Sequence, residues 1–507
     1  MDVHRTGESY WVETTEATAY PPLDGHLSVD VAMIGGGVAG LCTAWELVSA
    51  GRSVAVLEAD RIASGVTGHT TAKLSALQTF TYDRLRRSAG ADTARWYART
   101  QQDAIDRVEL TAESLGVDCD FERAAAYTYV ESPDGVDQAR AEADAARDAG
   151  LSASLVTDTP LPYDVAGAVK VENQAQFHPR RYLLAVAEGI VERRGVIHER
   201  TRVVDLDEGE PCELTTDTGA TVTARDVVVA THYPIFDRAL LFARLVPHRE
   251  VVVAGPLPED RAPDGMYITP EHGKRSVRTA PYRPGQRLLI VTGESFTPGE
   301  ADVTERYERL ESWTRERFAL KEITHRWAAQ DNQPTDGLPY IGLLHAAAKH
   351  AYVATGFGGW GLTNGVVSGL LLAALITDQV AQPPWADIYD PRRLHPLREA
   401  GAAVTAQAKV ARHLVGDRLR PTHVDSVEDV DPGSGAIVRL RGERCAVYRD
   451  GAGAAHAVSA TCTHLGCVVA FNDAETSWDC PCHGSRFGVD GAVLNGPATR
   501  PLEGRDT

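Results

Sequence analysis

The sequence predicts an α/β fold followed by a separate metal-binding region, and three observations support this prediction. An apolar segment at residues 28–34 runs into the glycine turn GGGVAG at 35–40 and then into an apolar helical stretch. A second apolar segment, 351–355, runs into a second glycine-rich turn at 356–361. The C-terminal region combines cysteines and histidines at short, ligand-like spacings. At 507 residues the chain is too long for one core, so two or three domains are expected.

The first glycine turn lies between two predicted strands, 28–34 and 53–57, and satisfies G-x-G-x-x-G. Its first glycine allows the tight turn, the second lets a pyrophosphate approach the backbone, and the third lets helix and strand pack closely. The helix N-terminus then faces the phosphates, and the acid that ends the second strand accepts a hydrogen bond from a ribose hydroxyl. The predicted contacts are Gly35, Gly37, Val38, Ala39, Gly40 and Glu58. This motif alone does not distinguish NAD from FAD.

The second glycine turn would bring another positive helix end to the cofactor. Together with DGLPYIG at 336–342, it resembles the C-terminal flavin-binding segment of the D-amino-acid-oxidase-type FAD oxidoreductases. Residues 67–73 resemble the loop that runs past the flavin ring in that group, and 227–234 resemble the strand that returns to the FAD site. The resemblance spans about 28–380 and implies a Rossmann-type FAD domain with an interleaved antiparallel substrate-side sheet. It adds His69, Thr70, Thr71, Gly356, Trp360, Gly361, Leu362 and Thr363 as FAD contacts.

Two short motifs, CTHLGC at 462–467 and CPCHGS at 480–485, carry the metal prediction. A four-thiolate cluster needs four cysteines, whereas a Rieske [2Fe–2S] centre replaces two thiolates with two imidazoles on one iron. Cys462 and Cys480 would bind one iron, and His464 and His483 the other. The alternative is a zinc site, but zinc ligands usually come as two Cys-x-x-Cys-like knuckles, which this pattern fits poorly.

Residues 421–507 resemble a Rieske domain of the cytochrome bc type, which implies an all-β fold. Cys467 and Cys482 are the one further cysteine in each motif, and a disulfide between them is expected. Residues 496–498 (GPA) resemble the proline loop that covers the cluster, and Ser485 matches the serine that hydrogen-bonds a bridging sulfide. Phe487 stands where the high-potential members of that family carry tyrosine, so a lower potential is expected.

The predicted organisation is an N-terminal arm at 1–27, FAD-binding and substrate domains at 28–392, a helical linker at 393–420 and the Rieske domain at 421–507. The linker prediction rests on apolar residues at helical spacing between 397 and 415. Because the FAD motifs end before residue 421, removal of residues 421–507 is expected to leave flavin reduction by the substrate largely intact.

The composition restricts the partners and the location. The formal charge is 51 − 70 = −19, which argues against nucleic acid or anionic lipid as the main partner. The N-terminus shows no apolar signal segment, and the most apolar run, 366–376, is too short to span a bilayer. A cytoplasmic protein without a transmembrane segment is expected, although a disulfide is unusual in that compartment.

The two cofactors together predict the function. A flavin accepts two electrons as a hydride, and a Rieske centre carries one electron at a time. The resemblance implies an amine or amino acid as the small-molecule CH–NH donor, with an external one-electron acceptor, and the fusion favours a dehydrogenase over an oxidase. The alternative is an electron-transfer or redox-sensing protein without a substrate. A Rieske oxygenase would need a separate iron site of two histidines and a carboxylate, and FAD motifs account for the rest of the chain.

A few single residues are candidates for substrate or cofactor chemistry. Arg278 is a candidate partner for a substrate carboxylate, because guanidinium binds carboxylates in a bidentate manner; the alternative is a surface arginine on a strand. Tyr267 is a second candidate, with packing as its alternative. His69 lies where related enzymes attach FAD covalently, and the alternative is a noncovalent loop residue. His248 and His272 are expected to face solvent.

Overall fold

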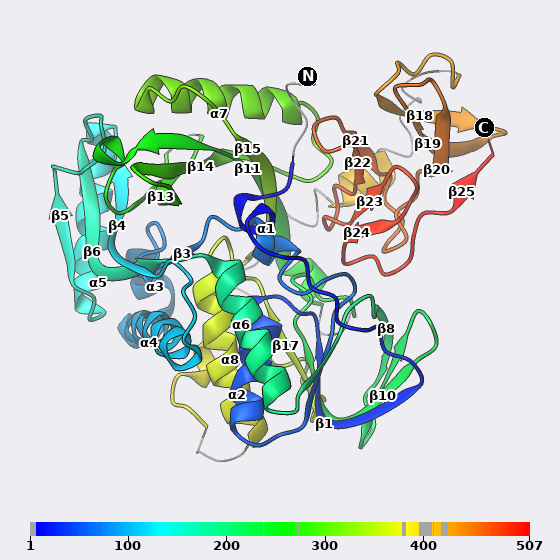
Figure 1. The fold of residues 1–507 in the computed structure, drawn as a ribbon, viewed down its shortest axis with the longest axis horizontal. Coiled ribbons are helices and arrows are strands. Elements are labelled where there is room, and N and C mark those ends of the chain that lie inside the picture. Colours follow the sequence, from blue (N-terminus) through cyan, green and yellow to red (C-terminus); the bar gives the residue numbers. More distant parts are fainter. Residues whose placement is uncertain are drawn as a thin grey trace.

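The computed structural model contains two large sheets and two small ones (Figure 1). It describes residues 7–236, 238, 240–271, 273–377, 382–394, 408, 410–416, 424 and 426–506.

The first large sheet is the predicted Rossmann-type sheet, with the strand order β16-β17-β10-β1-β2-β7. Its central strand β1 (His26–Ile34) pairs in parallel with β10 (Thr221–Val229) on one side and with β2 (Val54–Leu57) on the other. The remaining strands are β7 (Val196–His198), β8 (Val203–Asp207), β9 (Cys212–Thr216), β16 (Tyr340–Leu343) and β17 (Ala351–Thr355). Parallel neighbours joined through helices are the expected product of strand–helix–strand units.

Two helices that begin at the two predicted glycine turns pack against each other beside this sheet. They are α2 (Val38–Ser49) and α8 (Gly361–Thr377), with α6 (Pro179–Glu192) beside them (Figure 1). A Cβ added at Gly369 would lie 2.9 Å from the backbone of Cys42, so the absence of a side chain there sets the close approach. The apolar run 366–376 therefore forms a buried core helix. In the part of the chain that the structure describes, no helix combines the length and hydropathy needed to cross a membrane.

The second large sheet has nine strands in the order β15-β11-β14-β13-β12-β4-β6-β3, with β5 paired to β6. Its strands are β3 (Lys73–Leu74), β4 (Glu122–Val130), β5 (Ala153–Val156), β6 (Gly167–Gln176), β11 (Leu245–Pro258), β12 (Met266–Thr269), β13 (Arg275–Arg283), β14 (Gln286–Phe296) and β15 (His325–Pro334). All neighbours are antiparallel except β12 and β4, which run in parallel. These strands come from segments inserted between strands of the first sheet, so the prediction of an interleaved antiparallel sheet is confirmed.

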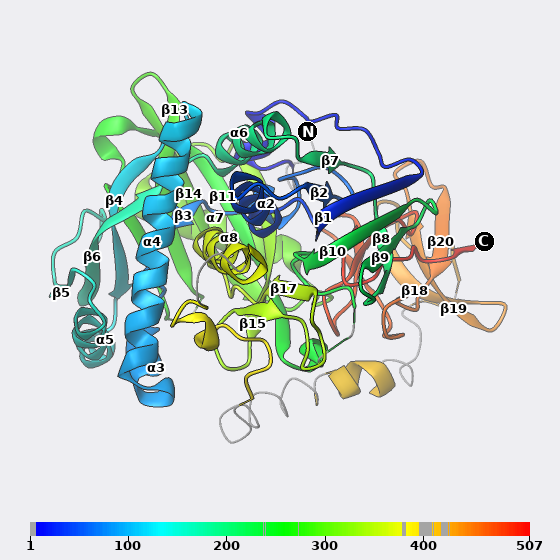
Figure 2. The ribbon, with the colours of Figure 1, turned by 90° about the horizontal axis from the view of Figure 1, so that it is seen from below.

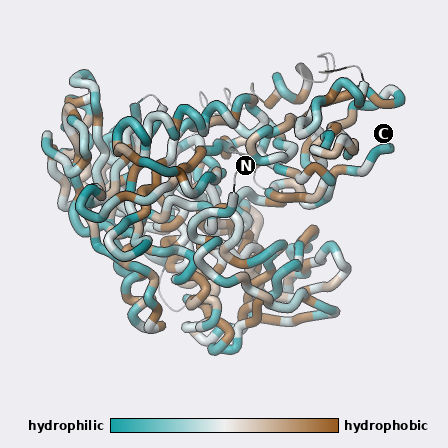
Figure 3. Tube along the Cα trace, turned by 45° about the horizontal axis from the view of Figure 1, so that its top comes forward, coloured by the Kyte–Doolittle hydropathy of each residue, from teal (hydrophilic) through white to brown (hydrophobic). Residues whose placement is uncertain are grey.

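Helices cover the outer parts of this second sheet. They are α3 (Tyr82–Ala89), α4 (Ala91–Leu115), α5 (Val136–Asp148) and α7 (Val303–Phe318). Hydrophobic segments follow the strands and packed helices of the interior, whereas the outer helices and loops are largely hydrophilic (Figure 3).

The C-terminal region folds as two small sheets, and every strand pair in them is antiparallel, so the all-β prediction is confirmed. One contains β18 (Gly435–Leu440), β19 (Glu443–Arg449), β20 (Ala455–Ser459) and β25 (Gly504–Arg505); the other contains β21 (Ala470–Asn472), β22 (Ser477–Asp479), β23 (Arg486–Gly488) and β24 (Val493–Asn495). Both lie at the end of the molecule opposite β5 and α5 (Figures 1 and 2).

From residue 7 onward, the N-terminal arm is anchored to the rest of the protein. Its short helix α1 (Tyr10–Glu13) buries Tyr10 and Trp11. The Trp11 indole donates a hydrogen bond to the carbonyl of Thr70 over 2.7 Å, and the Tyr10 hydroxyl donates to the carbonyl of Pro281 over 2.9 Å. The arm therefore braces the loop that is predicted to pass the flavin. Of the predicted linker helix, the structure describes residues 408 and 410–416, with a π-helical turn at Arg412–Gly416; its positions 397, 400 and 404 lie outside the described residues.

Candidate functional site

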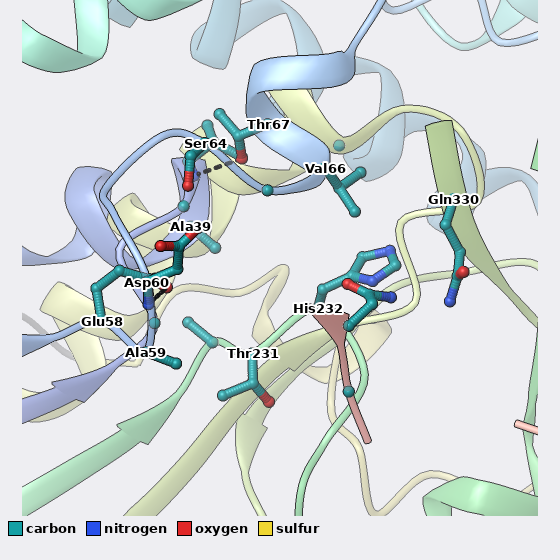
Figure 4. Close-up of a pocket in the computed structure, with 18 of the residues that line it drawn as sticks. Ala39, Glu58, Ala59, Asp60, Ser64, Val66, Thr67, Thr231, His232 and Gln330 are labelled. Atoms are coloured by element: carbon teal, nitrogen blue, oxygen red, sulfur yellow. Dashed lines mark hydrogen bonds between the residues drawn. The ribbon is translucent and has the colours of Figure 1, made fainter. Parts of the chain in front are cut away.

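A cavity of about 520 Å³ lies between the two large sheets and the C-terminal region. At one end Glu58 and Asp60 follow strand β2, and at the other His232 and Gln330 face the interior (Figure 4). Nine of the predicted FAD contacts line this cavity: Gly35, Gly37, Val38, Ala39, Glu58, Thr70, Thr71, Gly361 and Leu362.

The first glycine turn has the geometry that a dinucleotide requires. Gly35 has φ +108°, and a Cβ there would lie 2.5 Å from the carbonyl oxygen of Ala230. A Cβ at Gly40 would lie 1.9 Å from the carbonyl oxygen of Gly35, so Gly40 allows close packing although it does not line the cavity. Helix α2 then starts at the cavity wall, where the N–H groups of its first turn favour phosphate; the N–H of Val38 also donates to the Thr67 hydroxyl at 3.1 Å.

Glu58 fastens the turn from the neighbouring strand. Its carboxylate accepts hydrogen bonds from the backbone N–H of Gly36 at 2.7 Å and from that of Asp60 at 2.9 Å. Burial raises the pKa of this carboxyl group. Two bonds leave acceptor capacity on a carboxylate, and the side chain lines the cavity, so the residues present fit the ribose end of FAD.

Four other predicted contacts also lie outside the cavity wall. The His69 imidazole Nδ1 lies 2.9 Å from the carbonyl oxygen of Gly65, and its Nε2 lies 4.0 Å from Glu8; the structure thus offers no support for covalent attachment there. Gly356 and Trp360 line a neighbouring cavity. Thr363 is buried, and its hydroxyl accepts a hydrogen bond from the backbone N–H of Ser75 at 3.2 Å.

The two substrate candidates are buried in the sheet and do not line the cavity. Arg278 is 1% exposed, and it donates to backbone carbonyls, among them those of Ala72 and Thr279. Burial lowers its pKa to about 9. Tyr267 stacks on Tyr127 with ring centroids 4.8 Å apart, and its hydroxyl donates to the carbonyl of Asp264. Both side chains thus have structural partners in place of a substrate.

The expectation for His248 is wrong, because it lines the cavity and burial lowers its pKa; His272 lies outside the described residues. Other cavity residues were not singled out from the sequence: Asp60, Ser64, Thr67, Arg202, Thr231, His232, Glu250, Gln330 and Asp331. They come from loops and strands far apart in the chain, and of these residues Thr67, Thr231 and His232 belonged to segments with a recognisable pattern.

The cluster ligands converge in the C-terminal region. Cys462, Cys480 and His483 are buried, and the rings of His464 and His483 have centroids 4.9 Å apart. A hydrogen bond from the Cys480 thiol is the main cause that lowers the pKa of Cys462 to about 6, and it raises the pKa of Cys480, so the two sulfur atoms face each other at close range. Two paired thiols and two paired imidazoles are the donor set of a Rieske [2Fe–2S] cluster.

The predicted disulfide joins Cys467 to Cys482. Their sulfur atoms and that of Cys480 lie within 4.8 Å of one another, but two bonded sulfurs offer no thiolate, so this trio is not a metal site. The staple fixes the two cluster loops to each other instead.

The proline loop borders both cofactor sites. The backbone N–H of Ala498 donates to the hydroxyl of Ser485 at 3.0 Å, which ties the loop to the cluster side. The same segment lines the flavin cavity through Val493, Leu494, Asn495, Gly496, Ala498 and Thr499. The FAD motifs end earlier in the sequence, but residues of the Rieske domain form one wall of the cavity.

Side chains of the flavin domain also touch the cluster loops directly. The Tyr233 ring centroid lies 6.5 Å from that of His464 and 6.1 Å from that of His483, and the Phe242 ring lies 6.1 Å from His483. The Gln330 amide donates to the carbonyl of Gly484 at 3.0 Å. The two predicted cofactor sites thus share one interface.

This arrangement defines a flavin-dependent oxidoreductase with a built-in Rieske centre, and comparison with known proteins agrees. The family described as FAD dependent oxidoreductase (DAO) matches residues 30–375, and the Rieske [2Fe-2S] domain family matches residues 420–504. The chain belongs to this FAD dependent oxidoreductase family and carries a C-terminal Rieske domain; it binds FAD and a [2Fe–2S] cluster.

Individual relatives share the whole chain or its larger part. The putative Rieske 2Fe-2S iron-sulfur protein YhfW of Bacillus subtilis is 35% identical over 498 residues, which cover 98% of this chain and 97% of that protein. Gamma-glutamylputrescine oxidoreductase of Escherichia coli is 24% identical over 73% of this chain and 89% of its own length. The crystal structure of glycine oxidase from Geobacillus kaustophilus superposes with a TM-score of 0.60 at 20% identity, over 73% of this chain and 100% of that one.

Proposed function

We propose that this protein is an amine dehydrogenase that delivers electrons one at a time, through its Rieske cluster, to an external acceptor. When bound, FAD supplies hydride acceptance and the cluster supplies one-electron transfer. The balance is simple: an amine that loses a hydride becomes an iminium ion, and two molecules of a one-electron acceptor are each reduced once while one proton is released.

The observation that carries this proposal is the shared interface. The proline loop of the cluster domain lines the flavin cavity, and it is bonded to Ser485 on the cluster side. An oxidase hands its electrons directly to oxygen and gains nothing from a one-electron carrier held against its flavin site. The interface therefore supports a dehydrogenase whose cluster lies downstream of the flavin.

The charge of the cavity wall supports an amine rather than an amino acid as donor. The wall formed by the second sheet carries the carboxylates of Glu250 and Asp331. Burial opposes the ionisation of Glu250, but Lys274 at 2.6 Å and His248 outweigh it and hold its pKa below the usual value. Burial likewise opposes the ionisation of Asp331, and the neighbouring His232 lowers its pKa.

Positive charge on the described wall lies elsewhere. Arg61 and Arg202 line the cavity on the side of Glu58, and Arg278 does not line it. A substrate carboxylate would thus meet Glu250, whose charge Lys274 compensates, and Asp331, and it would find no guanidinium on that side, whereas an ammonium group would be attracted to Asp331. The gamma-glutamylputrescine oxidoreductase among the relatives bears a name of the same substrate class.

The test is anaerobic reduction of the full-length holoprotein by a panel of amines and amino acids, followed by flavin absorbance and by EPR of the cluster. Amines should bleach the flavin and then produce a Rieske-type EPR signal, while amino acids of similar size should not. Glu250→Gln and Asp331→Asn should raise the KM for the amine, and Lys349→Met, far out on the surface, serves as control.

Three results would contradict the proposal. Rapid hydrogen peroxide formation in air would indicate an oxidase. Failure of every donor to bleach the flavin would favour the alternative, an electron-transfer or redox-sensing protein fed by a partner. One zinc per chain without iron would remove the relay altogether.

A further inference from the structure

The turn after strand β10 joins the flavin cavity to the cluster within two residues. His232 has φ +66°, a left-handed conformation that is uncommon outside glycine. Its carbonyl accepts a hydrogen bond from the Thr355 hydroxyl at 2.6 Å, which holds the turn. Because the chain reverses here, His232 lines the cavity while the ring of Tyr233 meets both histidine ligands.

Tyr233 is fixed as well as buried. It is 1% exposed, the Thr231 hydroxyl donates to its carbonyl at 2.7 Å, and its own hydroxyl donates to the carbonyl of Phe242 at 3.3 Å. His483, which it contacts, is also 1% exposed. The contact therefore excludes water between the turn and the cluster ligand.

Gln330 provides a second connection from the same wall. Its side chain lines the cavity, and its amide donates to the carbonyl of Gly484, the residue that follows His483. Gly484 has φ +80°, and a Cβ there would lie 2.5 Å from the Gln330 amide nitrogen. The cluster loop can approach the wall this closely only because it carries glycine at that point.

Exposure distinguishes the two cluster loops. All six residues of the second loop, 480–485, are buried, whereas the first loop exposes Thr461, Thr463 and Leu465. The second loop is thus the side of the cluster turned toward the flavin domain.

We infer that Tyr233 and Gln330 are positioning residues that hold the second cluster loop against the wall of the FAD cavity, and that electrons cross between the two domains at this contact. The inference rests on the proposed relay and names where the relay crosses. With both groups bound, one electron would pass at a time, the flavin would be oxidised as the cluster is reduced, and the external one-electron acceptor of the proposed reaction would reoxidise the cluster. This hydrogen-bonded contact, which excludes water, fixes the separation of the two cofactors. Small displacements of reacting groups slow a reaction strongly.

The experiment uses full-length holoprotein carrying Tyr233→Leu, Tyr233→Phe or Gln330→Leu. Flavin is reduced by light with a deazaflavin sensitiser and EDTA as the sacrificial electron donor, so no amine substrate is required, and cluster reduction is followed by freeze-quench EPR. Tyr233→Leu should slow cluster reduction about tenfold to a hundredfold, and Gln330→Leu should slow it less, because the aromatic contact remains. Tyr233→Phe should stay close to the unmodified protein, because it keeps the ring.

A second measurement does not depend on turnover. Hydrogen–deuterium exchange of the backbone amides at 480–485 should rise in Tyr233→Leu and in Gln330→Leu. Tyr282→Leu and Gln333→Leu are matched controls away from the cluster loops and should change neither readout. FAD and iron contents, measured on each variant, show that both cofactors are retained.

The outcomes separate the two claims. Absence of cluster reduction in the unmodified protein would end the proposed relay. If the cluster is reduced in the unmodified protein and is reduced at the same rate in Tyr233→Leu and Gln330→Leu, the inference is overturned, even if amide exchange increases in the variants. Slowed reduction with retained cofactors supports it.

Discussion

Lys73 is a residue whose positive charge is disfavoured in the folded protein. It lies in strand β3 and is 8% exposed, and its amine donates to the carbonyl of Tyr267 at 3.0 Å and to the hydroxyl of Ser276. Burial lowers its pKa from 10.5 to about 7, and the nearby Arg278 adds to the effect. The unfolded chain therefore binds this proton more tightly than the folded chain does.

This difference predicts a pH dependence of stability. Between pH 7 and 10.5 the unfolded state holds the proton and the folded state does not, so the free energy of unfolding rises with pH, by at most about 1.4 kcal/mol per pH unit. Lys73→Met should lack this contribution. Urea denaturation at pH 7 and pH 9, followed by fluorescence, measures the free energy of unfolding of the unmodified protein and of Lys73→Met. If this free energy changed equally with pH in both proteins, Lys73 would stay charged in the folded state.

Phe487 is the residue that should set the cluster potential low. It is fully buried in the same hydrophobic cluster as Cys462 and Cys480, and it offers no hydroxyl. In Phe487→Tyr, one added hydrogen bond to sulfur of about 1 kcal/mol would raise a one-electron potential by about 40 mV. Redox titration by EPR measures the shift, with Phe471→Tyr as control. An unchanged or lower potential would mean that the new hydroxyl does not reach the cluster.

At the residue level, candidate ligands were easier to recognise in the sequence than residues of the cavity wall were. Cys462 and His464 are two residues apart, so local spacing reveals them. Gln330 and Glu250 come from separate strands and meet only in the folded sheet. Arg278 shows the converse: its residue type fits a carboxylate, but backbone carbonyls already satisfy its donors.

Between elements, an ion pair fixes the cluster domain to the second sheet. Arg249 of strand β11 is 3% exposed and reaches both carboxylate oxygens of Glu475, at 2.5 and 2.7 Å. Arg486 also pairs with Glu475 and, at 2.9 Å, with Asp479. The hairpin between β21 and β22 is thereby held against a strand more than two hundred positions earlier in the chain.

Removing one partner of such a buried pair is costly, because the other charge stays buried. Arg249→Met should weaken the attachment of the cluster domain by about 3 kcal/mol, at the low end for a broken buried ion pair. The loss is at the low end because Arg486 still compensates the charge of Glu475. Thermal melting followed by visible circular dichroism of the cluster should shift downward more than melting followed by flavin fluorescence. Lys349→Met breaks an exposed pair with Glu210 and should shift neither; equal shifts in both signals would contradict a local role for Arg249.

Elements with a strong local pattern were predicted well. Strand β1, helix α2 and strand β2 follow the predicted order within a few residues, because glycine turns and apolar runs act locally. The anchoring of the N-terminal arm was not predictable, since the partners of Tyr10 and Trp11 are the carbonyls of Pro281 and Thr70. Those contacts exist only once the sheet has formed.

Over the whole molecule, the sequence showed two functional units in series, and the structure shows one shared site. Motifs reveal the cofactors because each set of contacts recurs locally along the chain. The interface has no such pattern: Val493 and Asn495 are ordinary residues of a short strand, and their place at the cavity wall depends on how the domains dock.

This shared wall changes what truncation should do. Removing residues 421–507 takes away six cavity-lining residues between 493 and 499, so FAD should be held less tightly, with a rise in Kd of about tenfold or more. Equilibrium dialysis and FAD fluorescence after gel filtration measure the loss. The double variant Cys462→Ser/Cys480→Ser is the control, because it removes two iron ligands but keeps the loop; it should retain FAD while losing iron. If the truncated protein keeps FAD as well as the full chain does, the cluster domain only docks beside the flavin site; if it loses FAD and the cluster-free control does not, the domain is part of the site.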